Sequence, residues 1–203
     1  QHIEYEQQLE MKRRMVEDAL RRVGRFTELE VLPTLASPQQ LGYRNHARFT
    51  INREGNVGYI HRERRRFVEI DKCLLMGDGI NDTLRELQGR CAETTQVAVR
   101  HNAKSGSRLL QPTLKNSEIP LESGQKHYTE TVNGVSFQVA ASSFFQVNVK
   151  QSEHMAVLVR ESLRLSGQEL VVDSYAGVGT FAALLAPYAG RVIAIEESAS
   201  AIQ

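Results

Sequence analysis

The stretch Leu170-Val171-Val172-Asp173-Ser174-Tyr175-Ala176-Gly177-Val178-Gly179-Thr180 decides the fold of the second half of this sequence. A short apolar run ends in an acid, and two glycines separated by one residue follow. A second apolar run, residues 191–196, ends in Glu196, and the intervening residues 177–186 predict a helix that Pro187 ends. Strand, glycine-rich turn, helix and strand in this order predict a βαβ unit. Continuous apolar strands are typical of a parallel sheet covered on both faces.

This unit has the features of a nucleoside site. Gly177 and Gly179 allow a sharp turn and close approach of a ligand, and the helix after them directs free N–H groups toward it. The carboxylate of Glu196, at the end of the second strand, can accept hydrogen bonds from both hydroxyls of a ribose. With Ala182 the glycines also fit the relaxed dinucleotide pattern G-x-G-x-x-A. Asp173, four residues before Gly177, favours a ligand with an ammonium group, such as S-adenosylmethionine. A glycine-rich turn without a ligand is the third interpretation.

The first part of the sequence predicts a different architecture. Residues 4–23 predict an amphipathic helix that Gly24 ends, and residues 28–40 predict a connection. Residues 43–110 predict an α+β module with a largely antiparallel sheet. Its expected strands are 43–52, 57–60, 67–70, 96–100 and 108–110, and its expected helix is 79–91. Residues 131–139 predict a hairpin, and 151–165 a helix with Met155, Leu158, Val159 and Leu163 facing inward.

We therefore divide the chain into an N-terminal helix and linker (1–40), a central α+β domain (41–130) and the βαβ part (131–203). The composition of the 203 residues, 41% hydrophobic and 24% charged, excludes wholesale disorder. No apolar run approaches the roughly 20 residues of a membrane span, and the first residues do not resemble a signal peptide. Two cysteines make no disulfide scaffold, which indicates the cytoplasm. The first and last residues suggest a piece of a longer protein.

A basic patch is the second candidate site. The formal net charge is only +1, so a nucleic-acid site has to be local. Residues 41–72 contain eight Lys and Arg against four Asp and Glu, a local charge of +4. The densest run could be a solvated hairpin tip, but with two arginines on one face of a strand we favour contact with RNA phosphates, which would position RNA without reading its sequence. The candidate residues are Arg44, Arg48, Arg62, Arg64, Arg65 and Arg66.

Taken in order, several segments resemble RNA uracil-5-methyltransferases, which make 5-methyluridine in ribosomal or transfer RNA. The matching segments span most of the chain, with Ala176 where that family often has cysteine. They are Gln1-His2-Ile3, Tyr43-Arg44-Asn45-His46-Ala47-Arg48-Phe49, Gly58-Tyr59, Val68-Glu69-Ile70-Asp71-Lys72-Cys73, Phe144-Phe145-Gln146-Val147-Asn148 and Val172-Asp173-Ser174-Tyr175-Ala176-Gly177-Val178-Gly179.

The resemblance implies that residues 131–203 form the first part of a Rossmann-like class I methyltransferase domain that binds S-adenosylmethionine. It further implies that Gln146 contacts the cofactor from outside the βαβ unit, that Tyr175 and Thr180 line its pocket, and that Glu196 holds the ribose. For Phe144 and Phe145 we expect core packing, and Asn148 suits an N-cap.

In that family a cysteine adds to C6 of the uracil, C5 takes the methyl group, and a base removes the C5 proton. Both groups belong to segments that this chain does not contain, so it has no catalytic residue and we expect it to be inactive alone.

Cys73 matches the fourth ligand of a [4Fe–4S] cluster, whose other three would precede Gln1. Two strands alone would leave an open apolar face, so we expect self-association or poor order there. A non-catalytic RNA-binding module and an NAD-dependent oxidoreductase fragment are the alternatives.

Overall fold

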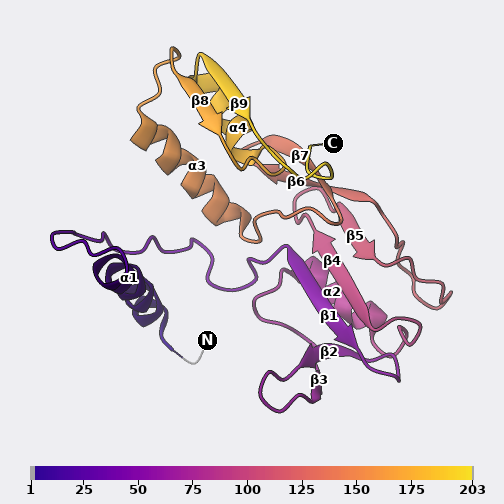
Figure 1. Cartoon of the computed structure of the whole chain (residues 1–203). Helices are drawn as coiled ribbons and strands as arrows, with labels where there is room; N and C mark the ends of the chain where they lie inside the picture. The colour runs from indigo at the N-terminus through magenta and orange to yellow at the C-terminus, as the bar shows by residue number, and fades with distance from the viewer. Residues whose placement is uncertain (1–2, 203) are drawn as a thin grey trace. The chain divides into compact units, whose positions relative to one another are not determined.

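The computed structural model describes residues 3–202, so most of the Gln1-His2-Ile3 segment lies outside the described residues. The chain divides into a first unit, residues 1–40, and a second unit, residues 41–203 (Figure 1). Within the described part, no helix combines the length and the apolar character that a bilayer crossing requires.

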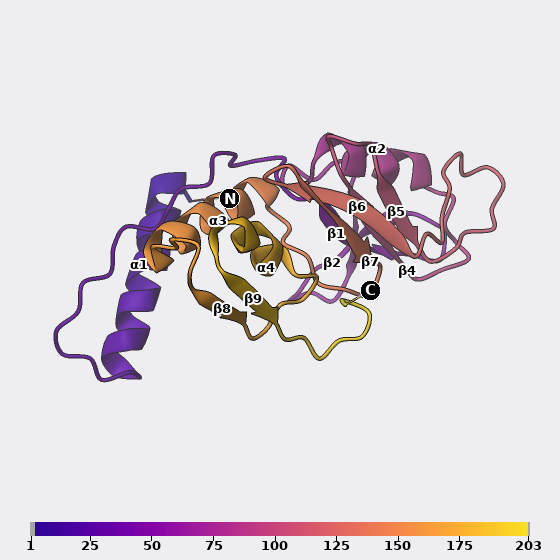
Figure 2. The ribbon, with the colours of Figure 1, turned by 90° about the horizontal axis from the view of Figure 1, so that it is seen from above.

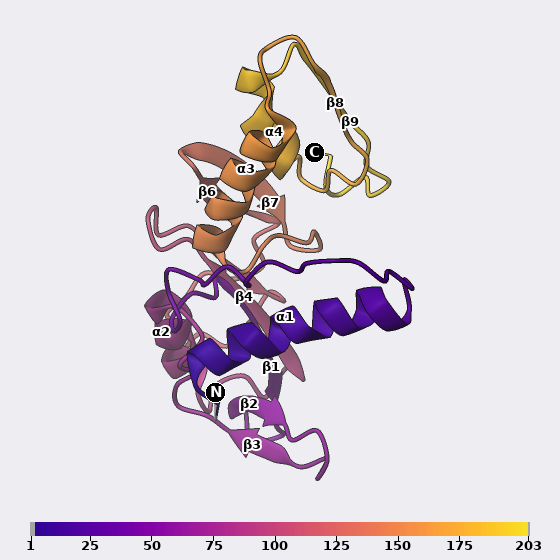
Figure 3. The same ribbon diagram turned by 90° about the vertical axis from the view of Figure 1, so that its left-hand side faces the viewer.

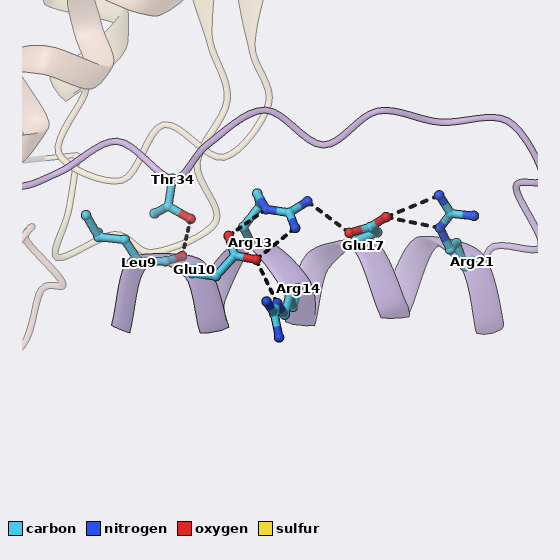
Figure 4. Close-up of polar contacts among 7 residues, drawn as sticks. All are labelled: Leu9, Glu10, Arg13, Arg14, Glu17, Arg21 and Thr34. Atoms are coloured by element: carbon cyan, nitrogen blue, oxygen red, sulfur yellow. Dashed lines mark hydrogen bonds and ion pairs between the residues drawn. The ribbon is translucent and has the colours of Figure 1, made fainter. Parts of the chain in front are cut away.

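The first unit consists of helix α1 (Tyr5–Arg22) and a segment that returns along it. Charged side chains one turn apart form a ladder of ion pairs, in which Glu10 binds Arg13 and Arg14, and Glu17 binds Arg13 and Arg21 (Figure 4). Pairs at this spacing stabilise an exposed helix by only about 0.3–0.5 kcal/mol each. None of the residues of α1 is buried, so ion pairs along the helix, and not a hydrophobic core, are its main side-chain interactions.

Hydrogen bonds hold the return segment on α1. The Thr34 hydroxyl donates to the Leu9 carbonyl at 2.9 Å, and the backbone N–H of Ser37 donates to the Tyr5 hydroxyl at 2.7 Å (Figure 4 shows the first). The predicted helix end is confirmed to within one residue, because Val23 is the C-cap and Gly24 follows it. The left-handed conformation falls one residue later, at Arg25 with φ 57°, while the N–H of Gly24 bonds to the Ala19 carbonyl.

The second unit begins with an antiparallel five-stranded sheet in the order β3-β2-β1-β4-β5 (Figures 1 and 2). Its predicted alternation is confirmed: Ala47, Phe49 and Ile51 are buried and Arg48 is exposed. Helix α2 packs on the buried face, with Leu84 and the other apolar side chains of this core. The elements are β1 (His46–Ile51), β2 (Val57–Ile60), β3 (Phe67–Glu69), α2 (Asp78–Leu87), β4 (Gln96–His101) and β5 (Arg108–Gln111).

A second core lies under the hairpin of β6 (His127–Val132) and β7 (Val135–Ala140) and under helix α3 (Val149–Leu163). The N-cap prediction is confirmed, since Asn148 accepts a hydrogen bond from the N–H of Gln151 at 3.0 Å. The predicted inward face of α3 is wrong for three of its four residues: Met155, Leu158 and Leu163 are 38–48% exposed, and Val159 is half-buried. The helix instead packs through small side chains, those of Ser152 and Ala156, which allow it to approach the hairpin closely.

The last elements are β8 (Leu170–Asp173), helix α4 (Thr180–Leu185), a short 3₁₀ turn (Ala186–Tyr188) and β9 (Arg191–Ala194). The two strands are parallel, as predicted, with Val172 opposite Ile193. Figure 3 shows β8 and β9 side by side. Helix α4 begins later than predicted because Gly177 and Gly179 have positive φ, 56° and 77°. Side chains of β8 stay open to solvent, Leu170 at 60% and Val172 at 50% exposed, so in the described part this pair is not covered on both faces.

Candidate functional site

A cavity of about 730 Å³ lies beside the glycine-rich turn, where the carboxyl ends of β8 and β9 meet. Strand β7 forms one wall, the turn and the start of α4 form the second, and the residues after β9 form the third. This volume is in the range of cofactor sites. The lining residues are Val135, Ser136, Phe137, Gln138, Ala176, Gly177, Val178, Gly179, Ala182, Ala183, Ala194, Ile195, Glu196, Ala201 and Ile202.

Glu196 bridges the turn and the segment after β9. Its Oε2 accepts a hydrogen bond from the N–H of Gly177 at 2.7 Å, and its Oε1 accepts one from the N–H of Ser198 at 2.8 Å. These donors, Ser198 first and Gly177 second, hold the pKa of Glu196 below its usual value. An ionised carboxylate has about four lone-pair sites, so acceptor capacity remains for a ligand diol at this edge of the cavity.

The structure brings only part of the predicted cofactor site together. Gly177, Gly179 and Glu196 line the cavity. Tyr175 is 93% exposed, Thr180 is buried at the start of α4, and neither is among the lining residues. Asp173 ends β8 as predicted, but it is not among the lining residues either. One of its carboxylate oxygens is buried without a hydrogen-bond partner in the described part, which leaves an acceptor next to the turn.

Gln146 does not line the cavity either, but its segment packs beside the turn. Phe145 is 3% exposed and lies in the core cluster against which Val178 and Phe181 pack, as expected for a core residue. Phe144 is 74% exposed, so its predicted core packing is wrong. Because Phe145 occupies the inward position, its neighbour faces solvent.

Sequence reasoning missed a buried polar cluster that holds this segment on the central sheet. The Asn45 amide donates to the carboxylate of Glu130 at 2.8 Å and to the Gln146 carbonyl at 3.2 Å. The Asn45 backbone N–H donates to the Val147 carbonyl at 3.1 Å. Burial raises the pKa of Glu130, which also accepts from the Tyr128 hydroxyl. Alternation within 127–132 places Tyr128 and Glu130 on the buried face of the strand. An acidic residue at a position predicted to be buried was the sequence signal that could have indicated this cluster.

Five of the six arginines of the predicted RNA site lie on β1 or on the hairpin tip between β2 and β3, and Arg44 lies two residues before β1. Arg48 is exposed on β1, whereas Arg44 is half-buried with its Nε unpartnered. Arg62, Arg64, Arg65 and Arg66 are exposed at the tip between β2 and β3, where the N–H of His61 bonds to the Arg66 carbonyl at 2.8 Å. None of the six forms an ion pair within residues 3–202.

Histidine His46 lies on the same strand between two of these arginines. Its pKa is lowered to about 4 by burial first, and then by the charges of Arg100, Arg48 and Arg44. It is therefore neutral at pH 7, and the positive charge of this face comes from its arginines.

The two cysteines are free thiols packed within the central domain. Cys91 is fully buried just after α2, and burial raises the pKa of its thiol to about 11, which fits the expected packing role. Cys73 is half-buried, and its backbone N–H donates to the Asn81 side chain at 2.9 Å. Among the described residues, no group of three or more His, Cys, Asp and Glu side chains could hold a metal ion.

Comparisons with known proteins identify relatives over nearly the whole chain. An uncharacterized RNA methyltransferase of Synechocystis is 30% identical over 97% of the chain, and one of Thermosynechococcus vestitus is 26% identical over all of it. The chain is a homologue of RNA methyltransferases. It spans about half the length of these relatives, 54% and 57%, and no family model matches it. The names of these relatives confirm the RNA methyltransferase part of the resemblance seen in the sequence.

A solved structure supports the fold of this homologue. The tRNA (uracil-54, C5)-methyltransferase of Pyrococcus abyssi, in complex with S-adenosyl-L-homocysteine, matches with a TM-score of 0.73. The match covers 99% of this chain and 59% of that one at 22% identity, so it demonstrates a common fold.

Proposed function

We propose that this chain is the RNA-binding and first cofactor-binding part of an S-adenosylmethionine-dependent enzyme that methylates C5 of a uridine in ribosomal or transfer RNA. The observation that carries the proposal is Glu196, held by the N–H of Gly177 at the carboxyl ends of two parallel strands, beside a cavity of cofactor size. The named homologues, and the fold shared with a structure that holds S-adenosylhomocysteine, support it.

The residues of this chain would bind and orient the cofactor. S-adenosylmethionine, when bound, supplies an electrophilic methyl group. Glu196 would accept hydrogen bonds from the ribose hydroxyls, and Gly177 and Gly179 would allow close approach of the nucleoside. Asp173 would face the cationic amino-acid end. Gln146, Tyr175 and Thr180 lie outside the cavity lining, and their contact with the cofactor in a Rossmann-like class I methyltransferase domain is proposed from the family resemblance alone.

RNA would lie on the basic sheet face. The arginines are free of ion pairs within the described part, so their charges are available to phosphates, and phosphate contacts would position the RNA. The proposed contacts are Arg44, Arg48, Arg62, Arg64, Arg65 and Arg66.

We propose that the chain alone does not methylate, since neither Cys73 nor Cys91 lines the cavity. For this chain by itself, a non-catalytic RNA-binding module is then the literal description.

Calorimetry with S-adenosylhomocysteine and NADH tests the cofactor assignment. We expect S-adenosylhomocysteine to bind, NADH not to bind, and Glu196→Ala to weaken binding at least about tenfold. Glu197→Ala is the matched control, since that exposed acid adjoins Glu196 and lies outside the cavity lining. Preferential binding of NADH would support the oxidoreductase alternative and overturn the proposal.

Three further proposals concern location, a cluster and self-association. The two cysteines of this chain are free, which is consistent with the cytoplasm, and a [4Fe–4S] cluster that uses Cys73 would need ligands from outside the described residues. The exposed β8 side chains Leu170 and Val172 would promote self-association of this chain. Sedimentation velocity tests this point: a monomer at all concentrations, unchanged by Val172→Asp, would contradict it.

A further inference from the structure

A continuous series of hydrogen bonds joins the central sheet to Glu196. The guanidinium of Arg100, a β4 residue that is 4% exposed, donates to the Ser143 carbonyl. The Ser143 hydroxyl donates to the Ser200 carbonyl at 3.0 Å, across 57 residues of sequence. The hydroxyls of Ser200 and Ser198 lie 3.0 Å apart, and the Ser198 N–H donates to Glu196.

Ser143 is the buried member of this series that joins two walls of the cavity. It is 4% exposed and lies in the loop after β7, three residues past the end of the strand, with its N–H bonded to the Ala140 carbonyl at 3.1 Å. Strand β7 supplies the first wall, and Ala201 and Ile202, next to Ser200, belong to the third. Glu196 is also held by the N–H of Gly177 on the glycine-rich turn. Within the turn 198–202, the Ala201 N–H bonds to the Ser198 carbonyl at 2.9 Å.

We propose that Ser143 is a positioning residue: its hydroxyl fixes the turn 198–202 against β7 and thereby holds Glu196 in place for the ribose diol of a nucleoside ligand. The inference rests on the proposed function for the identity of the ligand. It adds a residue that no sequence motif indicated and that does not itself touch the ligand. Arg100 on β4 donates a hydrogen bond to the Ser143 carbonyl. Ser143 therefore connects the position of Glu196 to the central sheet, which carries the proposed RNA-binding arginines.

The test is Ser143→Ala in the full chain, with calorimetry against S-adenosylhomocysteine. Removal of one hydrogen bond predicts binding weaker by about three- to tenfold. Ser152→Ala is the matched control, because Ser152 is equally buried at 3% exposed and also donates to a backbone carbonyl, that of Asn148. A double-mutant cycle separates positioning from general stability: in a Glu196→Ala background, Ser143→Ala should cost nothing further in affinity.

Amide hydrogen exchange over residues 196–202 supplies a second readout that needs no ligand. We expect Ser143→Ala to increase exchange there by at least about threefold, and Ser152→Ala to leave it unchanged. If the unmodified chain binds no S-adenosylhomocysteine, the proposed function fails while the exchange result still decides the role of Ser143. Unchanged exchange, or an affinity decrease of equal size in both backgrounds of the cycle, overturns the inference.

Discussion

Asn45 and Glu130, 85 residues apart in the sequence, form a buried hydrogen bond of 2.8 Å between an amide nitrogen and a carboxylate oxygen. They are 8% and 3% exposed. The Asn45 amide also bonds to the Gln146 carbonyl, so this pair attaches the segment before α3 to the first strand of the central sheet. The partners of Glu130 are neutral donors, namely Asn45, Tyr128 and the N–H of Thr131, and burial raises its pKa above the ordinary 4.5.

Glu130→Gln should therefore make the chain more stable at neutral and alkaline pH. Because the folded state has the higher pKa, it binds more protons than the unfolded state once the pH exceeds 4.5, and stability falls as the pH rises through the folded pKa. The glutamine cannot ionise and keeps an oxygen for Asn45, so we expect a gain of about 1 kcal/mol at pH 8 and none at pH 4. Urea unfolding between pH 4 and 8 measures it.

His46 contributes equally to the pH dependence of the unmodified chain and of the Glu130→Gln variant, so its contribution cancels when the two are compared. Its pKa is lowered to about 4, so the stability it contributes rises with pH between about 4 and 6.5, opposite in sign to that of Glu130. The difference curve between the Glu130→Gln variant and the unmodified chain contains only the glutamate. A difference that is flat from pH 4 to 8 would show that Glu130 does not titrate in this range.

Gly179→Ala should weaken cofactor binding beyond its effect on stability. Gly179 has φ 77°, and a Cβ added there would meet no atom within 4 Å, so backbone strain of about 1–2 kcal/mol is the whole cost to the chain. Gly106 has φ 72° and the same open surroundings, but lies in the turn between β4 and β5. Both alanine variants should lose similar stability in urea, whereas only Gly179→Ala should weaken binding of S-adenosylhomocysteine. Equal affinities would place the ligand away from the turn.

Gly58→Ala should destabilise the central sheet by about 3 kcal/mol or more, at the upper end of overpacking costs. A Cβ at this β2 position would collide with the carbonyl oxygen of Val68 on β3 and with the ring of Phe67. Gly77→Ala is the control, since its Cβ would lie 3.5 Å from the nearest atom, an ordinary contact. Thermal unfolding of both variants checks the difference, and a Gly58→Ala protein as stable as Gly77→Ala would contradict the packing of β2 on β3.

Elements that depend on local pattern could be predicted from the sequence, and long-range partners could not. Alternation from 43 to 52 predicted the buried face of β1, and the glycines before Thr180 predicted the turn between parallel strands. The inward face of α3 was assigned from its large apolar residues. The hairpin instead contacts Ser152 and Ala156, and which face a helix buries depends on its neighbour.

The residues of the candidate site also fall into those that a local sequence pattern predicted and those that depend on long-range contacts. Gly177, Gly179 and Glu196 were predictable because the carboxyl ends of adjacent parallel strands meet at one edge of a sheet. The link from Ser143 to Ser200 was not, because it joins two turns that no local pattern brings together. A serine in a loop has many possible partners, and only the tertiary fold, which brings the loop after β7 to the turn at Ser200, selects one.

The hairpin arginines give the prediction that tests RNA binding most directly. Arg64→Ala with Arg66→Ala should lower the slope of log K against log salt by about 1.4 for a single-stranded RNA, which is about 0.7 for each phosphate that the protein no longer neutralises. The control pair, Arg14→Ala with Arg22→Ala, removes the same net charge from exposed arginines that are already paired with Glu10 and Asp18 on α1. Filter binding of a labelled uridine-containing oligonucleotide from about 50 to about 300 mM salt measures both. If both pairs lower the slope equally, the affinity follows net charge and the hairpin tip is only a solvated turn.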